Sequence, residues 1–88
     1  METDMQATLK IAARARENGE PTVHLEVVVA GLLEPCLFEL LQSGGVIQSG
    51  DTGRFTVREP GSYSVIIRDA MGKWTTTNQV DLVEGWFA

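Results

Sequence analysis

Cysteine and histidine, the side chains that most often carry metal or covalent chemistry, are almost absent from this chain. One cysteine, Cys36, and one histidine, His24, occur among its 88 residues. A single cysteine excludes a disulfide within the chain and is typical of a reducing compartment. Because a zinc site made of cysteine and histidine needs about four such ligands, these two residues exclude that site as well.

Positive charge and long apolar runs are scarce too. Seven lysines and arginines stand against twelve aspartates and glutamates, which gives a formal net charge of −5. Nucleic acids and anionic lipid surfaces are bound by clustered positive charge, so we expect neither as a partner. No segment approaches the roughly 18 consecutive apolar residues of a membrane helix, and the polar first ten residues do not form a secretory signal.

The apolar residues that are present alternate with polar ones, which indicates β-strands. Alternation runs through residues 8–16 and again through 23–29, and Asn18-Gly19 lies between them. Asn-Gly favours the positive φ angles of a two-residue turn, so we predict a β-hairpin. The side chains expected to face inward are Leu9, Ile11, Ala13, Ala15, Val23, Leu25, Val27 and Val29.

The first of these segments has a second interpretation. Residues 5–17 are rich in alanine, leucine, lysine and arginine, which are good helix formers. Asp4 is a suitable residue to cap the start of a helix, and Gly19 is suitable to end it. A short helix therefore remains the alternative to a strand in this segment.

Short strands separated by turn residues follow along the rest of the chain. The expected strands are residues 36–42, 46–48, 54–58, 62–69 and 74–83. Turn signals about every 8–12 residues are typical of an antiparallel β-sandwich. We predict an all-β sandwich of about seven strands, a single domain over residues 1–88. The first strand and 46–48 are expected at sheet edges, 1–7 as a flexible arm and 84–88 as an aromatic tail.

One hairpin carries a residue pattern as well as a strand pattern. Residues 59–73 place Pro60-Gly61, Tyr63, Asp69 and Gly72 at the spacing P-G-x-Y-x-V-x-V-x-D-x-x-G, with isoleucine at the second valine position. The segment resembles the penultimate hairpin of bacterial and phage immunoglobulin-like (Ig-like) modules of the PKD type. The resemblance implies an Ig-like sandwich in which Tyr63 buries its ring and bonds its hydroxyl to nearby backbone. Modules of this family are spacers, adhesion repeats or virion appendages.

No constellation of residues points to catalysis or to a bound cofactor. His24 lies on the polar side of its strand without a nucleophile motif, so we interpret it as a surface histidine. Residues 45–52 match a phosphate-binding loop except at Asp51, whose charge repels phosphate. No D-x-D-x-D-G spacing supports calcium, although several acids near turns are suitable oxygen ligands. These acids are Glu34, Asp51, Glu59, Asp69 and Asp81. We predict neither an enzyme nor a bound metal.

Apolar residues at expected surface positions are the first signal of a partner. Alternation over residues 36–42 places Leu37 and Leu41 on the outward side. With Val28 and Ile66 they predict an apolar patch on one sheet, which marks an interface. The alternative is a sheet covered by the N-terminal segment.

Aromatic residues in the last part of the chain are the second signal. Trp86 and Phe87 lie in the tail, and Trp74 follows an expected turn. Tryptophan is enriched at binding hot spots, so these residues are candidates for partner docking, but folding back onto the domain's own core is the favoured interpretation. An exposed Trp74 also suits stacking against a carbohydrate.

Together these features predict a non-catalytic structural or protein-interaction module. The resemblance favours a virion-associated subunit, a capsid decoration or tail protein, and a homo-oligomer is a further expectation. For a complete chain the expected location is the virion or the host cytoplasm. The alternative is a spacer, adhesion or glycan-binding module of a longer bacterial surface or secreted protein, which is extracellular or at the cell surface.

Overall fold

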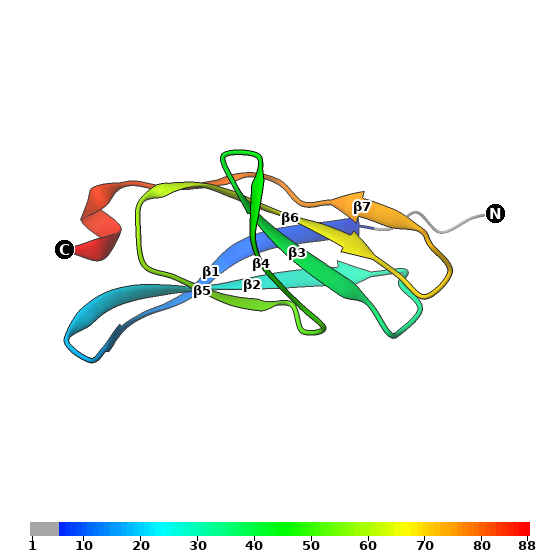
Figure 1. Cartoon of the computed structure of the whole chain (residues 1–88), viewed down its shortest axis with the longest axis horizontal. Coiled ribbons are helices and arrows are strands. Elements are labelled where there is room, and N and C mark those ends of the chain that lie inside the picture. Colours follow the sequence, from blue (N-terminus) through cyan, green and yellow to red (C-terminus); the bar gives the residue numbers. More distant parts are fainter. Residues whose placement is uncertain (1–5) are drawn as a thin grey trace.

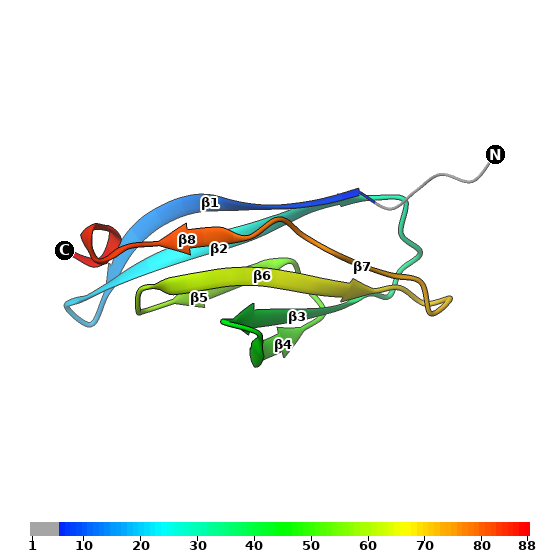
Figure 2. The same cartoon turned by 90° about the horizontal axis from the view of Figure 1, so that it is seen from above.

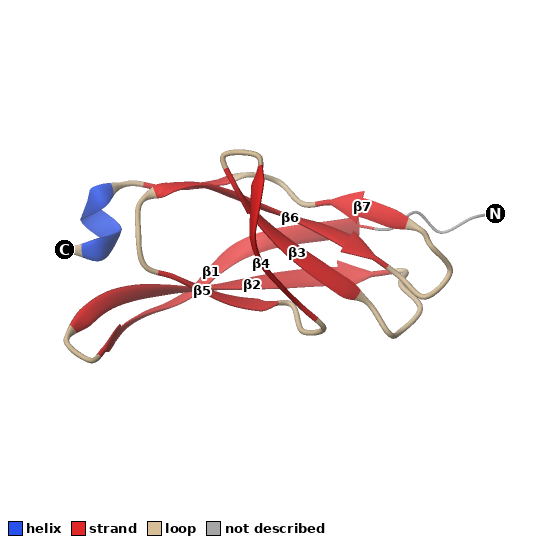
Figure 3. Ribbon diagram, viewed as in Figure 1, coloured by secondary structure: helices blue, strands red, loops and turns tan. Residues whose placement is uncertain are grey.

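Two antiparallel β-sheets pack face to face and form an all-β sandwich (Figures 1 and 3). The computed structural model describes residues 6–88. One sheet has the strand order β1-β2-β5, and the other has the order β4-β3-β6-β7, with β8 also paired to β6. The elements are β1 (Gln6–Glu17), β2 (Glu20–Ala30), β3 (Leu37–Gln42), β4 (Gly45–Gly50), β5 (Arg54–Val57), β6 (Gly61–Arg68), β7 (Trp74–Thr76), β8 (Val80–Leu82) and the short 3₁₀ helix η1 (Glu84–Phe87).

The first two strands form the hairpin that the Asn-Gly turn predicts. Asn18 and Gly19 have φ angles of 54° and 80°, the paired positive values of a type I′ turn. β1 pairs with β2 along its whole length and ends with Glu17 opposite Glu20. The helix alternative for this segment is wrong, because a long ladder and the burial of inward side chains outweigh helix propensity.

A β-bulge near the middle of β1 changes which side chains face the core. Ile11 lies opposite Leu25, but the register then shifts, so that Ala13 lies opposite His24. The extra residue of a bulge reverses the alternation beyond it. The prediction that Ala13 and Ala15 share the inward face with Leu9 and Ile11 is therefore wrong. Arg14 instead takes the position opposite the buried Val23.

The core lies between the sheets and consists of alternate residues from facing strands. Alternate residues of β5 and β6 are buried: Phe55, Val57, Tyr63, Val65 and Ile67. The hydroxyl of Tyr63 donates a hydrogen bond to the carbonyl oxygen of Glu59, as the resemblance implies. The buried apolar side chains are Leu9, Val23, Leu25, Val27, Phe38, Leu40, Phe55, Val57, Tyr63, Val65, Ile67 and Leu82.

The segment predicted as one final strand, 74–83, consists of two strands. β7 and β8 both pair with β6, on either side of Thr77. Thr77 is buried, and its hydroxyl accepts a hydrogen bond from the Val65 amide at 3.0 Å. The Thr77 hydroxyl thus takes the place of a backbone carbonyl as the acceptor for the Val65 amide. This interruption explains why the described residues form eight strands rather than about seven.

The sandwich has the shape of a rod, 47 Å long and 21 Å in both other directions. β1 begins at one end of the rod, and the chain ends at the opposite end (Figures 1 and 2). Residues 1–5 of the predicted arm lie outside the described residues. Gln6 and Ala7 are paired in β1, so the prediction of a flexible arm is wrong for these two residues. Within residues 6–88, no helix is long and apolar enough to span a membrane.

Candidate protein-interaction surface

One face of the five-stranded sheet points away from the core and carries three of the five predicted partner residues. On β3, Phe38 and Leu40 are buried in the core, whereas Leu37 is 44% exposed. Leu41 lies on the same outward side and is half-buried. The alternation of β3 is therefore as predicted.

Strand register brings Trp74 onto the same face. Directly opposed residues of antiparallel strands point their side chains to one side of the sheet. Leu37 of β3 lies opposite Arg68 of β6, and Arg68 lies opposite Trp74 of β7. Trp74 is 61% exposed. Leu37 and Trp74 thus flank one arginine in a single row across the sheet.

Two further rows belong to this surface, and the exposed Asp81, opposite Ser62, lies beyond them on the same side of the sheet. Glu39 lies opposite Ile66, and Leu41 lies opposite Val46 of β4. Leu40 pairs with Gln48 and Leu41 pairs with Val46, so Ile47 has no partner on β3. This register shift places Val46, which is 53% exposed, on the same side of the sheet as Leu41. Leu37, Glu39, Leu41, Val46, Ile66, Arg68 and Trp74 together form the outer face.

The outer face keeps Leu37, Leu41 and Ile66 of the predicted patch but not Val28. Val28 is 50% exposed but belongs to β2 in the three-stranded sheet, so grouping it with Leu37 and Leu41 was wrong. The first strand does not cover the outer face, because β1 pairs with β2 in the other sheet. The covering alternative is therefore wrong for residues 6–17.

An ion pair occupies the centre of the outer face. The Nε of Arg68 donates a hydrogen bond to the Oε1 of Glu39 at 3.4 Å. An exposed pair of this kind stabilises a protein by at most about 1 kcal/mol, so its main effect is on local charge. The outer face is close to neutral, although the whole chain carries −5.

The aromatic tail packs against the molecule itself. Trp86 and Phe87 of η1 are half-buried against the core. Arg14 of β1 lies over Trp86, with its Cζ 5.8 Å from the ring centroid, which is a cation–π contact. This contact follows from the β1 bulge, because the shifted register places Arg14 on the core side. The tail is folded back onto the core, as the favoured interpretation expected. A partner contact through these two aromatics stays a prediction.

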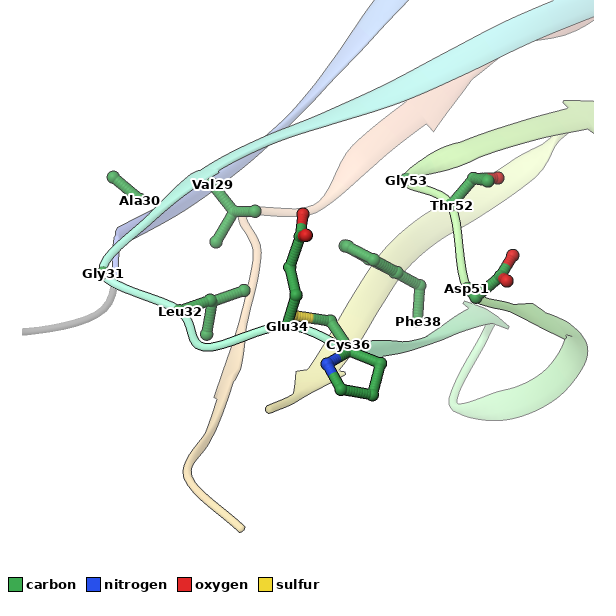
Figure 4. A pocket seen from close by; sticks show the side chains of 11 residues that line it. Val29, Ala30, Gly31, Leu32, Glu34, Cys36, Phe38, Asp51, Thr52 and Gly53 are labelled. Atoms are coloured by element: carbon green, nitrogen blue, oxygen red, sulfur yellow. The ribbon is translucent and has the colours of Figure 1, made fainter. Parts of the chain in front are cut away.

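A hollow of about 700 Å³ lies at the end of the rod where β2 leads into β3. In Figure 4, Glu34 and Asp51 appear on opposite sides of Phe38, and Cys36 lies behind Glu34. Burial raises the pKa of the Cys36 thiol above its ordinary 9.0, and the charges of Glu34 and Asp69 raise it further. The thiol is therefore protonated near neutral pH and is not a ready nucleophile.

The acids considered as calcium ligands do not form a site in the described structure. Asp69 is buried and accepts hydrogen bonds from two backbone amides of its own turn, each at 2.9 Å. Hydrogen bonds from the side chains of Ser62 and Gln79 hold the pKa of Asp81 below its ordinary 3.8. Among residues 6–88, no three acids, histidines or cysteines are grouped as metal ligands are.

His24 lies on the polar side of β2, as predicted. Its Nδ1 is 3.0 Å from the hydroxyl oxygen of Thr56, which lies directly opposite on β5. This contact connects two neighbouring strands of the three-stranded sheet. The interpretation of His24 as a surface histidine fits this position.

None of the protein-family models, curated proteins and solved structures compared with the chain matches it significantly. The fold and its surface define the class: an all-β sandwich with one exposed and partly apolar sheet face. The function is therefore argued from the residues of that face.

Proposed function

We propose that the protein is a non-catalytic structural module that binds another protein through the outer face. The observation that carries this proposal is the exposure of Leu37 and Trp74, 44% and 61%, in one row of a paired sheet. Exposed tryptophan beside apolar residues is a frequent hot spot of protein interfaces. Because paired strands are already ordered, binding here orders few additional groups.

An Ig-like topology is part of this proposal. The arrangement of β1-β2-β5 against β4-β3-β6-β7 supports it, because Ig-like domains pack two antiparallel sheets of this kind. The hydrogen bond from the Tyr63 hydroxyl to the carbonyl of Glu59, four residues upstream, adds support. In Ig-like domains, a tyrosine near the start of the penultimate strand makes this bond to upstream backbone.

The partner in this proposal is a virus particle, on which the module serves as a capsid decoration or tail subunit. The resemblance of residues 59–73 to modules of phage proteins supports this assignment. A narrow rod with one apolar face is also suited to bind the repeated surface of a particle. The net charge of −5 opposes binding to packaged nucleic acid.

Co-sedimentation tests the proposal. The purified chain is mixed with particles made from the structural proteins encoded beside its gene, and the mixture is separated on a density gradient. Wild type is expected to sediment with the particles, whereas Trp74→Glu is expected to stay at the top. Val28→Glu is the matched control, since Val28 is 50% exposed on the other sheet. A wild-type chain that stays free at micromolar concentration contradicts the virion assignment.

A spacer or adhesion module of a bacterial surface protein is the second candidate, and the rod geometry favours it. β1 begins at one end of the 47 Å rod and the chain ends at the other, so copies joined in series extend in one direction. A glycan-binding version of this candidate predicts a change in Trp74 fluorescence on addition of sugar, which Trp74→Phe abolishes. An unchanged spectrum across a glycan panel refutes that version.

A further inference from the structure

We propose that the protein bound at the outer face is a second copy of this chain, related by a two-fold axis. The inference rests on the proposed function, in which the outer face binds protein, and it adds a second occupant of that face: in free solution the outer face pairs with another copy, and on a particle this dimer gives way to the particle. In a two-fold dimer, when residue i of one copy contacts residue j of the other, j also contacts i. The outer face therefore has to complement itself.

The charges of the outer face meet this condition. Glu39 and Arg68 lie on adjacent strands one row apart, and their side chains are 3.4 Å from each other. A two-fold axis that lies in the interface and passes between them sets each carboxylate against the guanidinium of the other copy. The two pairs then form a ring of four alternating charges, in which no like charges are adjacent.

The apolar residues around this pair are placed to contact their own counterparts. Leu37 lies opposite Arg68, and Ile66 lies opposite Glu39. These four residues form the corners of a square, with the two charged residues on one diagonal and Leu37 and Ile66 on the other. A two-fold axis that exchanges the positions of the two charges runs close to the line from Leu37 to Ile66. Leu37 then packs on Leu37 of the second copy, and Ile66 packs on Ile66. Trp74, 61% exposed beyond Arg68, lies at the rim.

Charge also favours the outer face over the opposite side of the rod. Two chains of −5 repel each other in most orientations, but on the outer face Glu39 is balanced by Arg68. On the other sheet, Glu26 lies between Lys10 and Arg54 in one row. That row has an excess of positive charge, so two copies of it repel.

The size of the outer face predicts a reversible dimer. Strands about 4.8 Å apart and residues about 3.4 Å apart give a surface roughly 15 Å by 17 Å. Two such surfaces bury roughly 500 Å² in total, which is below the roughly 1,200 Å² of a standard specific interface. We therefore expect a weak dimer that exchanges with monomer at high micromolar concentration or above.

Charge reversal with mixing tests this dimer. Sedimentation velocity over a concentration series is expected to show wild type changing from monomer to dimer. Glu39→Arg leaves two positive charges on the outer face, and Arg68→Glu leaves two negative charges. Each variant alone is expected to dimerise about tenfold more weakly or worse. An equal mixture of the two is expected to recover dimer, because every positive charge again faces a negative one.

The controls separate this result from an effect on folding. Each single variant loses the pair within its own chain, so an effect on folding alone predicts no recovery on mixing. Glu26→Arg is the matched control, because it breaks the 3.8 Å pair with Lys10 on the other sheet. It is expected to dimerise as wild type does. Thermal unfolding of each variant checks that it is folded.

Three results overturn the inference: a wild type that is monomeric up to millimolar concentration, single variants that dimerise as wild type does, and a mixture that stays monomeric. Each leaves the proposed function standing if Trp74→Glu still abolishes co-sedimentation with particles. A different result separates the two proposals the other way. If the chain forms a charge-dependent dimer but never sediments with particles, the dimer is supported and only the virion partner is contradicted.

Discussion

Tyr63 has a fully buried ring and a hydroxyl group that is hydrogen-bonded. The residue is 0% exposed, and its hydroxyl donates a hydrogen bond to the carbonyl oxygen of Glu59. Burial raises the pKa of the phenol above its ordinary 10.0, and the charge of Glu59 raises it further. The neutral form therefore stabilises the fold, and the ionised form does not fit the site.

Replacement of Tyr63 by phenylalanine tests both properties. Tyr63→Phe keeps the ring and loses one hydrogen bond, so we expect the free energy of unfolding to fall by about 1 kcal/mol near neutral pH. Because the pKa is raised in the folded state, the contribution of Tyr63 is fully present below pH 10.0 and is lost as pH rises through the folded-state value. Urea unfolding at neutral and strongly alkaline pH is expected to show a smaller difference between the proteins at alkaline pH. A difference that does not change with pH contradicts this account.

Both outer edges of the three-stranded sheet are held by carboxamide side chains from the other half of the sandwich. Asn78, between β7 and β8, accepts from the Leu9 amide at 2.9 Å and donates to the Leu9 carbonyl at 3.1 Å. Gln48 of β4 donates to the Thr56 carbonyl of β5 at 2.8 Å. Each side chain occupies backbone groups that an edge strand otherwise offers to foreign strands. The same bonds connect the two sheets.

Removal of the Asn78 amide is expected to loosen β1. Asn78→Ala loses two hydrogen bonds to Leu9, so we expect a loss of about 1–3 kcal/mol in the free energy of unfolding. Hydrogen exchange at the Leu9 amide is expected to become faster than in wild type. Gln79→Ala is the control, since its amide donates to the exposed Asp81 carboxylate, and a change within about 0.5 kcal/mol is expected. Unchanged exchange at Leu9 refutes a role for Asn78 in holding this edge.

The positions of the strands could be predicted from sequence, but the register shift in β1 could not. Alternation over residues 23–29 and the Asn18-Gly19 turn report on local geometry, which each segment carries in its own residues. The bulge depends on the partner strand. Because Ala12 and Ala13 are both small, either one satisfies the alternation, and only pairing with β2 decides between them. Arg14 took the core side for this reason.

The candidate site shows the same division between local and long-range information. Leu37, Leu41 and Ile66 were predicted because alternation within a single strand places each of them outward. The rest of the outer face depends on cross-strand register: Trp74 joins Leu37 only through Arg68 of β6. Val46 depends on the shifted pairing of β3 with β4. Such pairings between distant segments are set by tertiary packing, which the pattern of one segment does not contain.

For the molecule as a whole, the folded tail is expected to stabilise the sandwich. Trp86→Ala removes a half-buried ring and its contact with Arg14, so we expect a loss of roughly 1–3 kcal/mol in the free energy of unfolding. Trp74→Ala removes a tryptophan that is 61% exposed, and a change within about 0.5 kcal/mol is expected. Denaturant unfolding followed by circular dichroism compares the two variants. Equal losses contradict the packed position of Trp86.

The placement of β1 and β8 along the rod has a mechanical consequence. β1 starts at one end and runs toward the other, and β8 leads to the end of the chain there (Figure 2). A force that pulls the two ends apart acts along the axes of these strands and loads their ladders to β2 and β6 in shear. In shear the hydrogen bonds of a ladder resist together, whereas in peeling they fail one after another. The strands of the sandwich are thus oriented to resist tension along its length.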